Sequence, residues 1–223
     1  IRNVKLVAVC DVDTHKAKDL SIQYGVTAYT DMVEMAKKEL LDVCVILTPS
    51  GMHAEHTIRL APHCSSIIVE KPMALTLDQA DAMIAACDSN STRLFVIKQN
   101  RYNVPVIKTK EAIDSEEFGR LVLGTVRVRW CRDQQYYDND AWRGTWSMDG
   151  GVLTNQASHH IDLLIWLMGN VSSVFAKSTT ALVDIEAEDT AVATIQFENG
   201  ALGIIEATTA ARPMNLEGSL SIL

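Results

Sequence analysis

The order of apolar and polar positions along the chain changes near its middle. In the first half, short and nearly continuous apolar runs are separated by longer segments of mixed character. A run of this kind is typical of a parallel strand that is buried on both faces. Strands that alternate with helices at this spacing predict an α/β fold with a doubly wound parallel sheet. The expected strands are Val4–Cys10, Val26–Tyr29, Asp42–Leu47, Ser66–Val69 and Leu94–Ile97.

The segments between these runs have helical periodicity and recognisable boundaries. Gly25 follows the first of them, as glycine often does after a helix. Thr76 and Gln79 have the spacing of a capping box at the start of another. The expected helices are Thr14–Tyr24, Asp31–Glu39, His53–Ala61 and a helix that runs from Thr76 to Cys87.

After a further expected helix at Val104–Ser115, the pattern changes to an alternation of apolar and polar residues. Along Leu121–Arg132, Val126 and Val128 fall on one face, and Arg127 falls on the other. Such alternation predicts a sheet with one solvated face. We therefore predict a Rossmann-like domain over residues 1–100 and an α+β domain with an antiparallel sheet over residues 101–223. Its other strands are expected at Ser172–Val183, Thr190–Phe197 and Ala201–Thr209, the last two joined by an Asn199-Gly200 turn.

Both ends of the pattern differ from what a complete fold of this kind requires. A dinucleotide-binding fold should place a strand and a GxGxxG turn about 20 residues before an acidic residue such as Asp11. Only ten residues precede Asp11, and none is glycine. Either the first strand and the Gly-rich loop are missing, or the fold is a different one, and we favour the first interpretation. Glu217–Leu223 begins a strand with no evident partner, so we expect the C-terminal domain to be cut as well.

Composition and charge exclude some classes of partner. The 223 residues carry a net charge of −8, which argues against nucleic acid or an anionic membrane as the main partner. No apolar run approaches the roughly 20 residues that a membrane span needs. The cysteines are odd in number, widely spaced and without a CxxC pair, which predicts buried free thiols in a cytoplasmic protein. They are Cys10, Cys44, Cys64, Cys87 and Cys131.

Polar residues follow the expected strands of the first half. Ligands of doubly wound sheets bind outside the carboxyl ends of the strands. Asp11 follows a strand at the position where an acidic residue holds an adenosine ribose, which would favour NAD over NADP. A helix cap or a surface turn is an equal alternative for Asp11. The other polar segments there are Thr48-Pro49-Ser50, Glu70-Lys71-Pro72 and Gln99–Asn103.

The stretch Asp149–Gly169 predicts an apolar helix with one polar stripe. Asn155, His159 and Asp162 lie at i, i+4 and i+7, which places them on the same helical face. Gly150-Gly151 would let backbone approach a ligand closely. The alternative is a core histidine whose nitrogens are satisfied by Asn155 and Asp162.

Taken together, these motifs resemble the Gfo/Idh/MocA family, the relatives of glucose-fructose oxidoreductase and inositol dehydrogenase. The resemblance covers essentially the whole chain. This chain differs from the family pattern at one position, since the family usually has Asp where this chain has Asn155. The residues that carry it are Glu70-Lys71-Pro72, Trp142-Arg143, Gly150-Gly151 and His159-His160-Ile161-Asp162.

The resemblance implies NAD as cofactor and a role for most of these residues. Lys71 and His159 would lie by the nicotinamide and the carbon that is oxidised, and Lys71-Pro72 would be a cis peptide. A homo-oligomer is also implied. The residues implied to bind or line the cofactor site are Asp11, Thr48, Pro49, Ser50, His53, Glu70, Trp142 and Arg143.

Within the family, the chain is most similar to enzymes that oxidise the 3-hydroxyl of UDP-N-acetylglucosaminuronic acid for surface polysaccharide synthesis. The segments that carry this similarity are Lys98–Asn103, Trp142–Trp146, Asn155–Leu164 and Glu206–Leu220. A uronate and a diphosphate call for cations and amide donors. The residues expected to bind such a substrate are Asn155, Arg101, Tyr102, Asn103 and Arg212. For Arg101 and Arg212, a solvated or structural arginine is an equal alternative.

Oxidation of a secondary alcohol needs a base for the proton and a cation near the developing alkoxide. Histidine has the unperturbed pKa nearest neutrality, so we assign the proton to His159 and polarisation of the oxygen to Lys71. The reverse assignment stays open. Asp162 is expected to orient His159.

Three other functions remain open from the sequence. Another polyol or sugar dehydrogenase, acting on inositol or a hexose, would keep the catalytic residues and differ only in substrate contacts. A non-catalytic NAD-binding regulator would need neither Lys71 nor His159. A metal site at His53, His56 and His63 is the third, although these histidines lack an acidic partner at ligand spacing.

Overall fold

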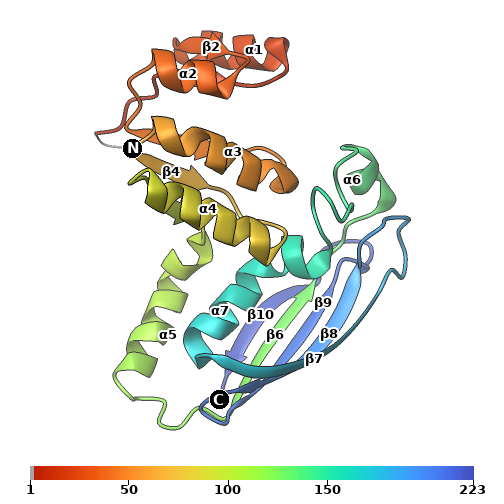
Figure 1. The fold of residues 1–223 in the computed structure, drawn as a ribbon. Helices are drawn as coiled ribbons and strands as arrows, with labels where there is room; N and C mark the ends of the chain where they lie inside the picture. Colours follow the sequence, from red (N-terminus) through yellow and green to blue (C-terminus); the bar gives the residue numbers. More distant parts are fainter. Residues whose placement is uncertain (1–2) are drawn as a thin grey trace. The chain divides into compact units, whose positions relative to one another are not determined.

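The computed structural model describes residues 3–223 as two compact units (Figure 1). The first unit contains the chain up to Thr48 together with Met52–Ile97. The second contains Pro49–Gly51 and Lys98–Leu223. Among the described helices, none is both long enough and apolar enough to cross a membrane.

The strands of the first unit are all parallel, which confirms the predicted Rossmann-like arrangement. They form two sheets, one of the order β1-β2 and one of the order β3-β4-β5. Three of these strands are shorter than the apolar runs that predicted them, while Ser66–Val69 has its predicted bounds and the last strand begins one residue earlier than predicted. Their bounds are β1 (Ala8–Cys10), β2 (Thr27–Tyr29), β3 (Val43–Ile46), β4 (Ser66–Val69) and β5 (Arg93–Val96).

Three α-helices of this unit begin at a side chain that caps them, while the helix that begins at His53 has no side-chain cap. Asp13, Asp31 and Thr76 each accept a hydrogen bond from a backbone N–H in the first turn of the helix that follows. Gly25 ends the first helix at φ 66°, in the left-handed region that glycine enters without strain. The helices are α1 (Thr14–Tyr24), α2 (Met32–Lys38), α3 (His53–Leu60) and α4 (Leu77–Ser89), with short 3₁₀ turns η1 (Ser50–Met52, shared by both units) and η2 (Ala61–His63).

The core of the first unit lies around β4. Ile67, Val69 and Met83 are completely buried, and they belong to a cluster of apolar side chains from β3, β4, α3 and α4. Removing a side chain of this size from such a core typically costs about 2–5 kcal/mol. This cluster therefore holds the carboxyl ends of β3 and β4, where the polar segments begin.

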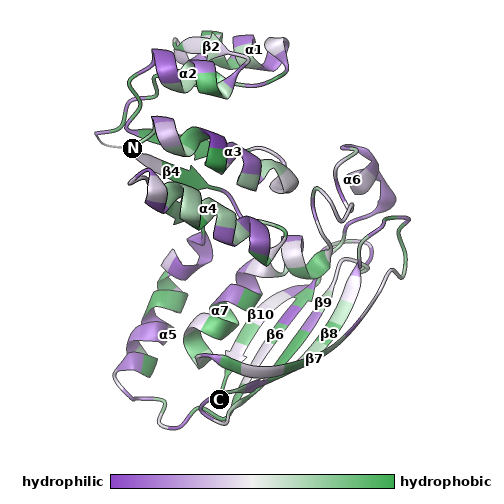
Figure 2. Ribbon diagram, in the orientation of Figure 1, coloured by the Kyte–Doolittle hydropathy of each residue, from purple (hydrophilic) through white to green (hydrophobic). Residues whose placement is uncertain are grey.

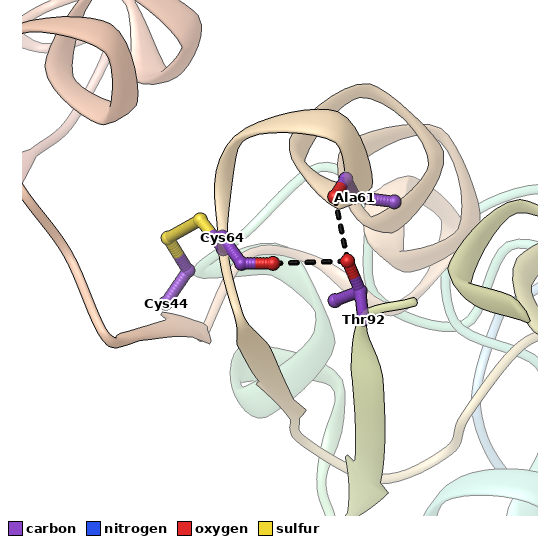
Figure 3. The surroundings of a disulfide bond; sticks show 4 residues. All are labelled: Cys44, Ala61, Cys64 and Thr92. Atoms are coloured by element: carbon purple, nitrogen blue, oxygen red, sulfur yellow. Dashed lines mark hydrogen bonds between the residues drawn. A yellow bond between two sulfur atoms is a disulfide. The ribbon is translucent and has the colours of Figure 1, made fainter. Parts of the chain in front are cut away.

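The structure corrects the expectation that all five cysteines are free. Cys44 on β3 and Cys64 just before β4 form a disulfide, with their Cα atoms 6.4 Å apart (Figure 3). The parallel pairing of β3 with β4 brings together two cysteines 20 positions apart, which spacing alone did not reveal. Beside them the buried Thr92 hydroxyl lies 2.7 Å from Ala61 O and 2.9 Å from Cys64 O. Cys10, Cys87 and Cys131 are free thiols.

The second unit is built on one five-stranded sheet of the order β10-β6-β9-β8-β7. Three of its four strand pairs are antiparallel, as predicted, while β6 and β9 are parallel. The prediction that the last strand has no partner was wrong, because β10 pairs along its length with β6. The strands are β6 (Leu123–Arg129), β7 (Val171–Thr179), β8 (Thr190–Phe197), β9 (Leu202–Thr208) and β10 (Glu217–Ile222).

The predicted single helix over Asp149–Gly169 is divided in two. Val152–Gln156 forms a π-helical turn, η4, and the α-helix α7 begins only at Ser158 and ends at Met168. The wider π turn breaks the α-helical spacing between Asn155 and His159. The unit's other helices are η3 (Gln99–Tyr102), α5 (Val104–Asp114) and α6 (Gln134–Asp138).

Helix α7 covers one face of the sheet (Figure 1). Leu164 and Met168 pack onto β6 at Gly124, where an added Cβ would lie 2.6 Å from Leu164 Cδ1. Val126 and Val128 are completely buried on the same face. Burial alternates along β8 and β9, as expected for a sheet with one covered face, and both strands carry apolar as well as polar segments (Figure 2).

The opposite face of the sheet carries ion pairs between neighbouring strands. Arg129 on β6 donates from its Nε and Nη2 atoms to the two oxygens of Glu206 on β9, at 2.6 and 2.9 Å. This fork lowers the pKa of Glu206. Arg127 on β6 and Glu217 on β10 extend the same network. Cross-strand pairs of opposite charge stabilise the register of these three strands.

His160 on α7 packs against Trp130, which directly follows β6. Its ring meets the Trp130 ring edge-on, with centroids 5.7 Å apart. Its Nδ1 atom is buried and has no hydrogen-bond partner among residues 3–223. Burial lowers the pKa of His160, because the charged imidazolium loses its hydration.

We expect the stability of the protein to fall as His160 becomes protonated. The folded state binds this proton less readily than the unfolded chain, so the stability is fully present above the ordinary histidine pKa of about 6.5 and is lost as the pH falls through it. Denaturant unfolding from about pH 7.5 to about pH 5.5 should show this loss, at no more than about 1.4 kcal/mol per pH unit for one proton. His160→Leu should give a shallower decline, with a remainder from His56, whose pKa burial also lowers. Equal declines in the two proteins would contradict this assignment.

Candidate functional site

The predicted site residues lie in both units. In the first unit, Asp11 follows β1 and its Oδ1 atom accepts a hydrogen bond from Asp13 N at 2.8 Å. This is the only hydrogen bond of the Asp11 side chain among residues 3–223. Asp13, and not Asp11, caps helix α1. One carboxylate oxygen of Asp11 is thus free to accept from a ribose hydroxyl, which fits NAD.

The loop after β3 is held by two histidines of α3. His53 is 1% exposed, and its Nε2 atom lies 2.8 Å from Thr48 O. The Thr48 hydroxyl lies 3.0 Å from His56 Nδ1. The carbonyl and the hydroxyl of Thr48 are therefore both engaged by α3.

The loop after β4 carries Lys71 on a constrained backbone. Lys71-Pro72 is a cis peptide, as the resemblance implied. Lys71 N donates to Glu70 Oε2 at 3.1 Å, and His53 Nδ1 lies 2.7 Å from Pro72 O. Glu70 and His53 thus hold backbone groups on the two sides of Lys71. Direct contact of Glu70 or His53 with a cofactor stays a prediction.

Pro49 and Ser50 belong to the second unit. Gly51 N donates to Met148 O at 2.9 Å, and an added Cβ at Gly51 would overlap the backbone at Ser147. The Ser50 residue is 6% exposed. The segment after Thr48 is therefore packed closely against the chain just before Gly150.

Two buried carboxylates hold the π turn that carries Asn155. Asp149 is 2% exposed and accepts from Gly144 N at 2.8 Å and from the Asn155 amide. Glu188 is 7% exposed and accepts from Leu153 N at 3.0 Å. An added Cβ at Gly151 would overlap the Glu188 carboxylate. In this structure the room at Gly151 is filled by the chain's own carboxylate rather than left for a ligand.

His159 stands one turn before Asp162 on α7, and η3 packs against this helix. Gln99 Nε2 lies 3.4 Å from His159 Nε2. Asp162 accepts two hydrogen bonds, both of 2.7 Å, from Arg101 Nε and Nη2. Arg101 also lies over the Trp166 ring, at 5.1 Å from its centroid. Asp162 is thus engaged by a cation, which differs from the expectation that it serves His159.

The Trp142-Arg143 segment forms a stack with a neighbouring aromatic ring. The Arg143 guanidinium lies 4.6 Å from the Tyr136 ring centroid and 4.7 Å from that of Trp142. It also donates to Asp140 at 2.9 Å and to the Tyr136 hydroxyl at 2.6 Å. This guanidinium is held in a fixed orientation before any ligand binds.

The remaining predicted substrate residues are spread over the second unit. Tyr102 is 80% exposed on η3, and Asn103 follows it. Arg212 donates to the carbonyl oxygens of Thr209, Ala211 and Arg132. Arg212 thus supports the loop before β10, and contact with a substrate stays a prediction.

The sequence placed Gln99 in a polar segment after a strand without indicating a role for it, and it indicated no role for Asp149 or Glu188. Asp149 could have been suspected, since it stands directly before the glycine pair. Nothing in the sequence links Glu188 to Gly151, which is 37 positions earlier. Across residues 3–223 no cluster of three or more His, Cys, Asp and Glu side chains could hold a metal ion. His53 and His56 instead engage backbone and hydroxyl groups.

Two protein-family models match the chain. Residues 1–98 match the oxidoreductase family with an NAD-binding Rossmann fold, and residues 106–222 match the GFO/IDH/MocA C-terminal domain. The second match alone covers more than half of the chain.

Solved structures and a curated relative agree with this assignment. The WlbA dehydrogenase from Bordetella pertussis, in complex with NADH and UDP-GlcNAcA, is 42% identical with a TM-score of 0.95, over 98% of this chain and 67% of that one. The WlbA enzyme from Chromobacterium violaceum, with the same two ligands, is 39% identical with a TM-score of 0.96, over 98% and 64%. A 1-carboxy-3-chloro-3,4-dihydroxycyclohexa-1,5-diene dehydrogenase from Comamonas testosteroni is 30% identical over 89% of this chain. The chain spans half of that relative's length. The chain belongs to the Gfo/Idh/MocA oxidoreductase family.

Proposed function

We propose that the whole protein uses NAD⁺ to oxidise the 3-hydroxyl of UDP-N-acetylglucosaminuronic acid to the 3-keto sugar. The observation that carries this proposal is the similarity, at 42% and 39% identity, to two dehydrogenases solved with NADH and UDP-GlcNAcA. Lys71 and His159, the two residues that the chemistry requires, are both present.

Binding of NAD is assigned first to the first unit. Asp11 follows β1 with one carboxylate oxygen available for ribose hydroxyls, and its negative charge would repel the 2′-phosphate of NADP. Thr48, Pro49 and Ser50 are proposed to line the nicotinamide side. Trp142 and Arg143 are proposed to contact the cofactor from the second unit. Bound NAD⁺ would accept the hydride that leaves the alcohol carbon.

The catalytic roles are proposed for two side chains. His159 takes the hydroxyl proton, and the Lys71 ammonium stabilises the negative charge that develops on the oxygen. The opposite assignment uses the same two groups. Asn155 cannot take a proton, so we assign it a hydrogen bond to the sugar. Its amide is already oriented by Asp149.

The anionic groups of the substrate are assigned to the remaining polar residues. Arg101 uses Nε and Nη2 on Asp162, which leaves Nη1 for a carboxylate or phosphate oxygen. Because Asp162 neutralises the charge of Arg101, the guanidinium would orient the substrate by a hydrogen bond more than it would attract the substrate by its charge. Tyr102 could stack on a ring, and Asn103 and Arg212 could supply further donors. We place the reaction in the cytoplasm, which the three free thiols support and the Cys44–Cys64 disulfide opposes.

The proposed reaction can be tested on the whole protein by following NADH absorbance. UDP-N-acetylglucosaminuronic acid should be oxidised with a far higher kcat/KM than myo-inositol or glucose. Lys71→Met and His159→Asn should each lower kcat by about 10²–10⁴-fold, the range typical for loss of a positioned acid or base. Lys108→Ala, which removes an exposed lysine of α5, should keep the wild-type rate.

Each alternative function predicts a different result of this assay. Faster oxidation of inositol or a hexose would identify another sugar dehydrogenase of the family. NAD binding without turnover of any of these alcohols would indicate a regulator. Near wild-type rates in both the Lys71 and the His159 variants would refute the assigned mechanism.

We also propose that the protein forms a homo-oligomer through the sheet face that α7 leaves uncovered. Phe175 on β7, Val192 on β8, and Leu202 and Ile204 on β9 point to this face and are 42–66% exposed. An exposed apolar patch over three neighbouring strands is typical of an interface. Analytical ultracentrifugation should find a dimer or tetramer for the wild type and a monomer for the Val192→Glu/Ile204→Glu variant. A monomeric wild type would contradict this proposal.

A further inference from the structure

His53 connects two loops that end neighbouring strands of the first unit. Its Nε2 atom lies 2.8 Å from Thr48 O in the loop after β3, and its Nδ1 atom lies 2.7 Å from Pro72 O in the loop after β4. The residue is 1% exposed, and its contact with Pro72 O is buried, whereas its contact with Thr48 O is partly buried. A carbonyl oxygen only accepts hydrogen bonds, so the ring donates from a nitrogen that carries a proton. The neutral ring has one such N–H and donates to one of the two carbonyls at a time.

The connection matters because Pro72 directly follows Lys71. The backbone N–H of Lys71 donates to Glu70 Oε2 at 3.1 Å, and the carbonyl of Pro72, the residue after Lys71, contacts His53. The backbone that carries the lysine is therefore fixed on both sides. A buried carbonyl without a donor costs about 1–3 kcal/mol, so loss of the imidazole would favour a different loop conformation.

Helix α3 provides a rigid base for this connection. His53 stands at the first position of α3, which packs against β3 and β4. His56, one turn later, reaches the Thr48 hydroxyl at 3.0 Å. The helix thus holds Thr48 at two atoms and Pro72 at one.

We propose that His53 is a positioning residue that sets the Lys71 loop in register with the Thr48 loop and does not itself bind the cofactor. The effect of His53 on catalysis rests on the proposed function, in which Lys71 is a catalytic residue. Both ring nitrogens face carbonyls of the chain itself, which favours positioning over the direct cofactor contact expected from the resemblance. A displacement of about 1 Å at a reacting group can cost about 100-fold in rate. The lysine should therefore be misplaced, while the ribose contact at Asp11 should not change.

Three substitutions in the whole protein separate the two contacts of the ring. His53→Phe keeps a ring of similar size and removes both ring nitrogens. In His53→Asn the amide nitrogen takes the place of Nδ1 and can reach Pro72 O. In His53→Gln the amide nitrogen takes the place of Nε2 and can reach Thr48 O. His63→Phe, on η2, is the matched control, since it removes a histidine that none of these contacts uses.

We expect His53→Phe to lower kcat by about 10–100-fold with less than a threefold change in the Kd for NAD⁺. His53→Asn should recover most of kcat, because it keeps the bond next to Lys71, and His53→Gln should recover less. Unchanged kcat in a folded His53→Phe protein would overturn the proposal. A loss of NAD⁺ affinity with unchanged kcat would also overturn it and would indicate direct cofactor contact.

Hydrogen exchange of the unliganded protein tests the same inference without any turnover. Mass spectrometry should find faster exchange for peptides covering 47–49 and 70–73 in His53→Phe than in the wild type and in His63→Phe. This result would support the positioning role even if the wild type oxidised none of the tested alcohols, in which case only the proposed function would fail. Equal exchange in all three proteins would refute the role. If His53→Phe does not fold, His53→Asn and His53→Gln provide the same comparison.

Discussion

Backbone polar groups that leave regular secondary structure inside the protein must find partners, and here buried side chains supply them. His53 serves the carbonyls of Thr48 and Pro72, and Glu188 serves the N–H of Leu153. Asp149 serves the N–H of Gly144. In each case the irregular segment beside the contact carries or adjoins a residue that the proposed chemistry uses. The conformation of the candidate site therefore depends on these hydrogen bonds.

The buried carboxylates that supply these hydrogen bonds also restrict which residue can stand beside them. Gly151 has no Cβ because the Glu188 carboxylate occupies that space. The π turn beside it moves Asn155 off the α-helical stripe and onto the Asp149 carboxylate. On α7 itself, Asp162 receives the Arg101 fork, which fastens the η3 turn and its Gln99 near His159. Packing and site geometry thus use the same polar contacts.

Much of the fold could be predicted from the sequence, because local signals agree with it. Helix α1 was predicted with its observed bounds, and Gly25 marked its end in the sequence. The alternation along β6 and the Asn199-Gly200 turn identified the sheet of the second unit. The π turn was missed because an apolar run with helical spacing does not distinguish α from π hydrogen bonding. The pairing of β10 with β6 and the Cys44–Cys64 bond were missed because they join residues far apart in the chain.

The residue types of the candidate site were predictable, while their partners were not. Lys71 and His159 were identified from short motifs, and the cis Lys71-Pro72 peptide was confirmed. The partners of His53 and Asp162 depend on loops that end different strands and helices. No spacing rule predicts such contacts, so only the fold reveals that His53 faces two carbonyls.

The central claim, oxidation at a single carbon of the sugar, is tested most directly with isotope-labelled substrate. UDP-N-acetylglucosaminuronic acid that carries deuterium only on C3 should transfer that deuterium to the nicotinamide of the reduced cofactor, which mass spectrometry detects. Reduced cofactor without deuterium, or no reduction at all with the whole protein, would contradict the account.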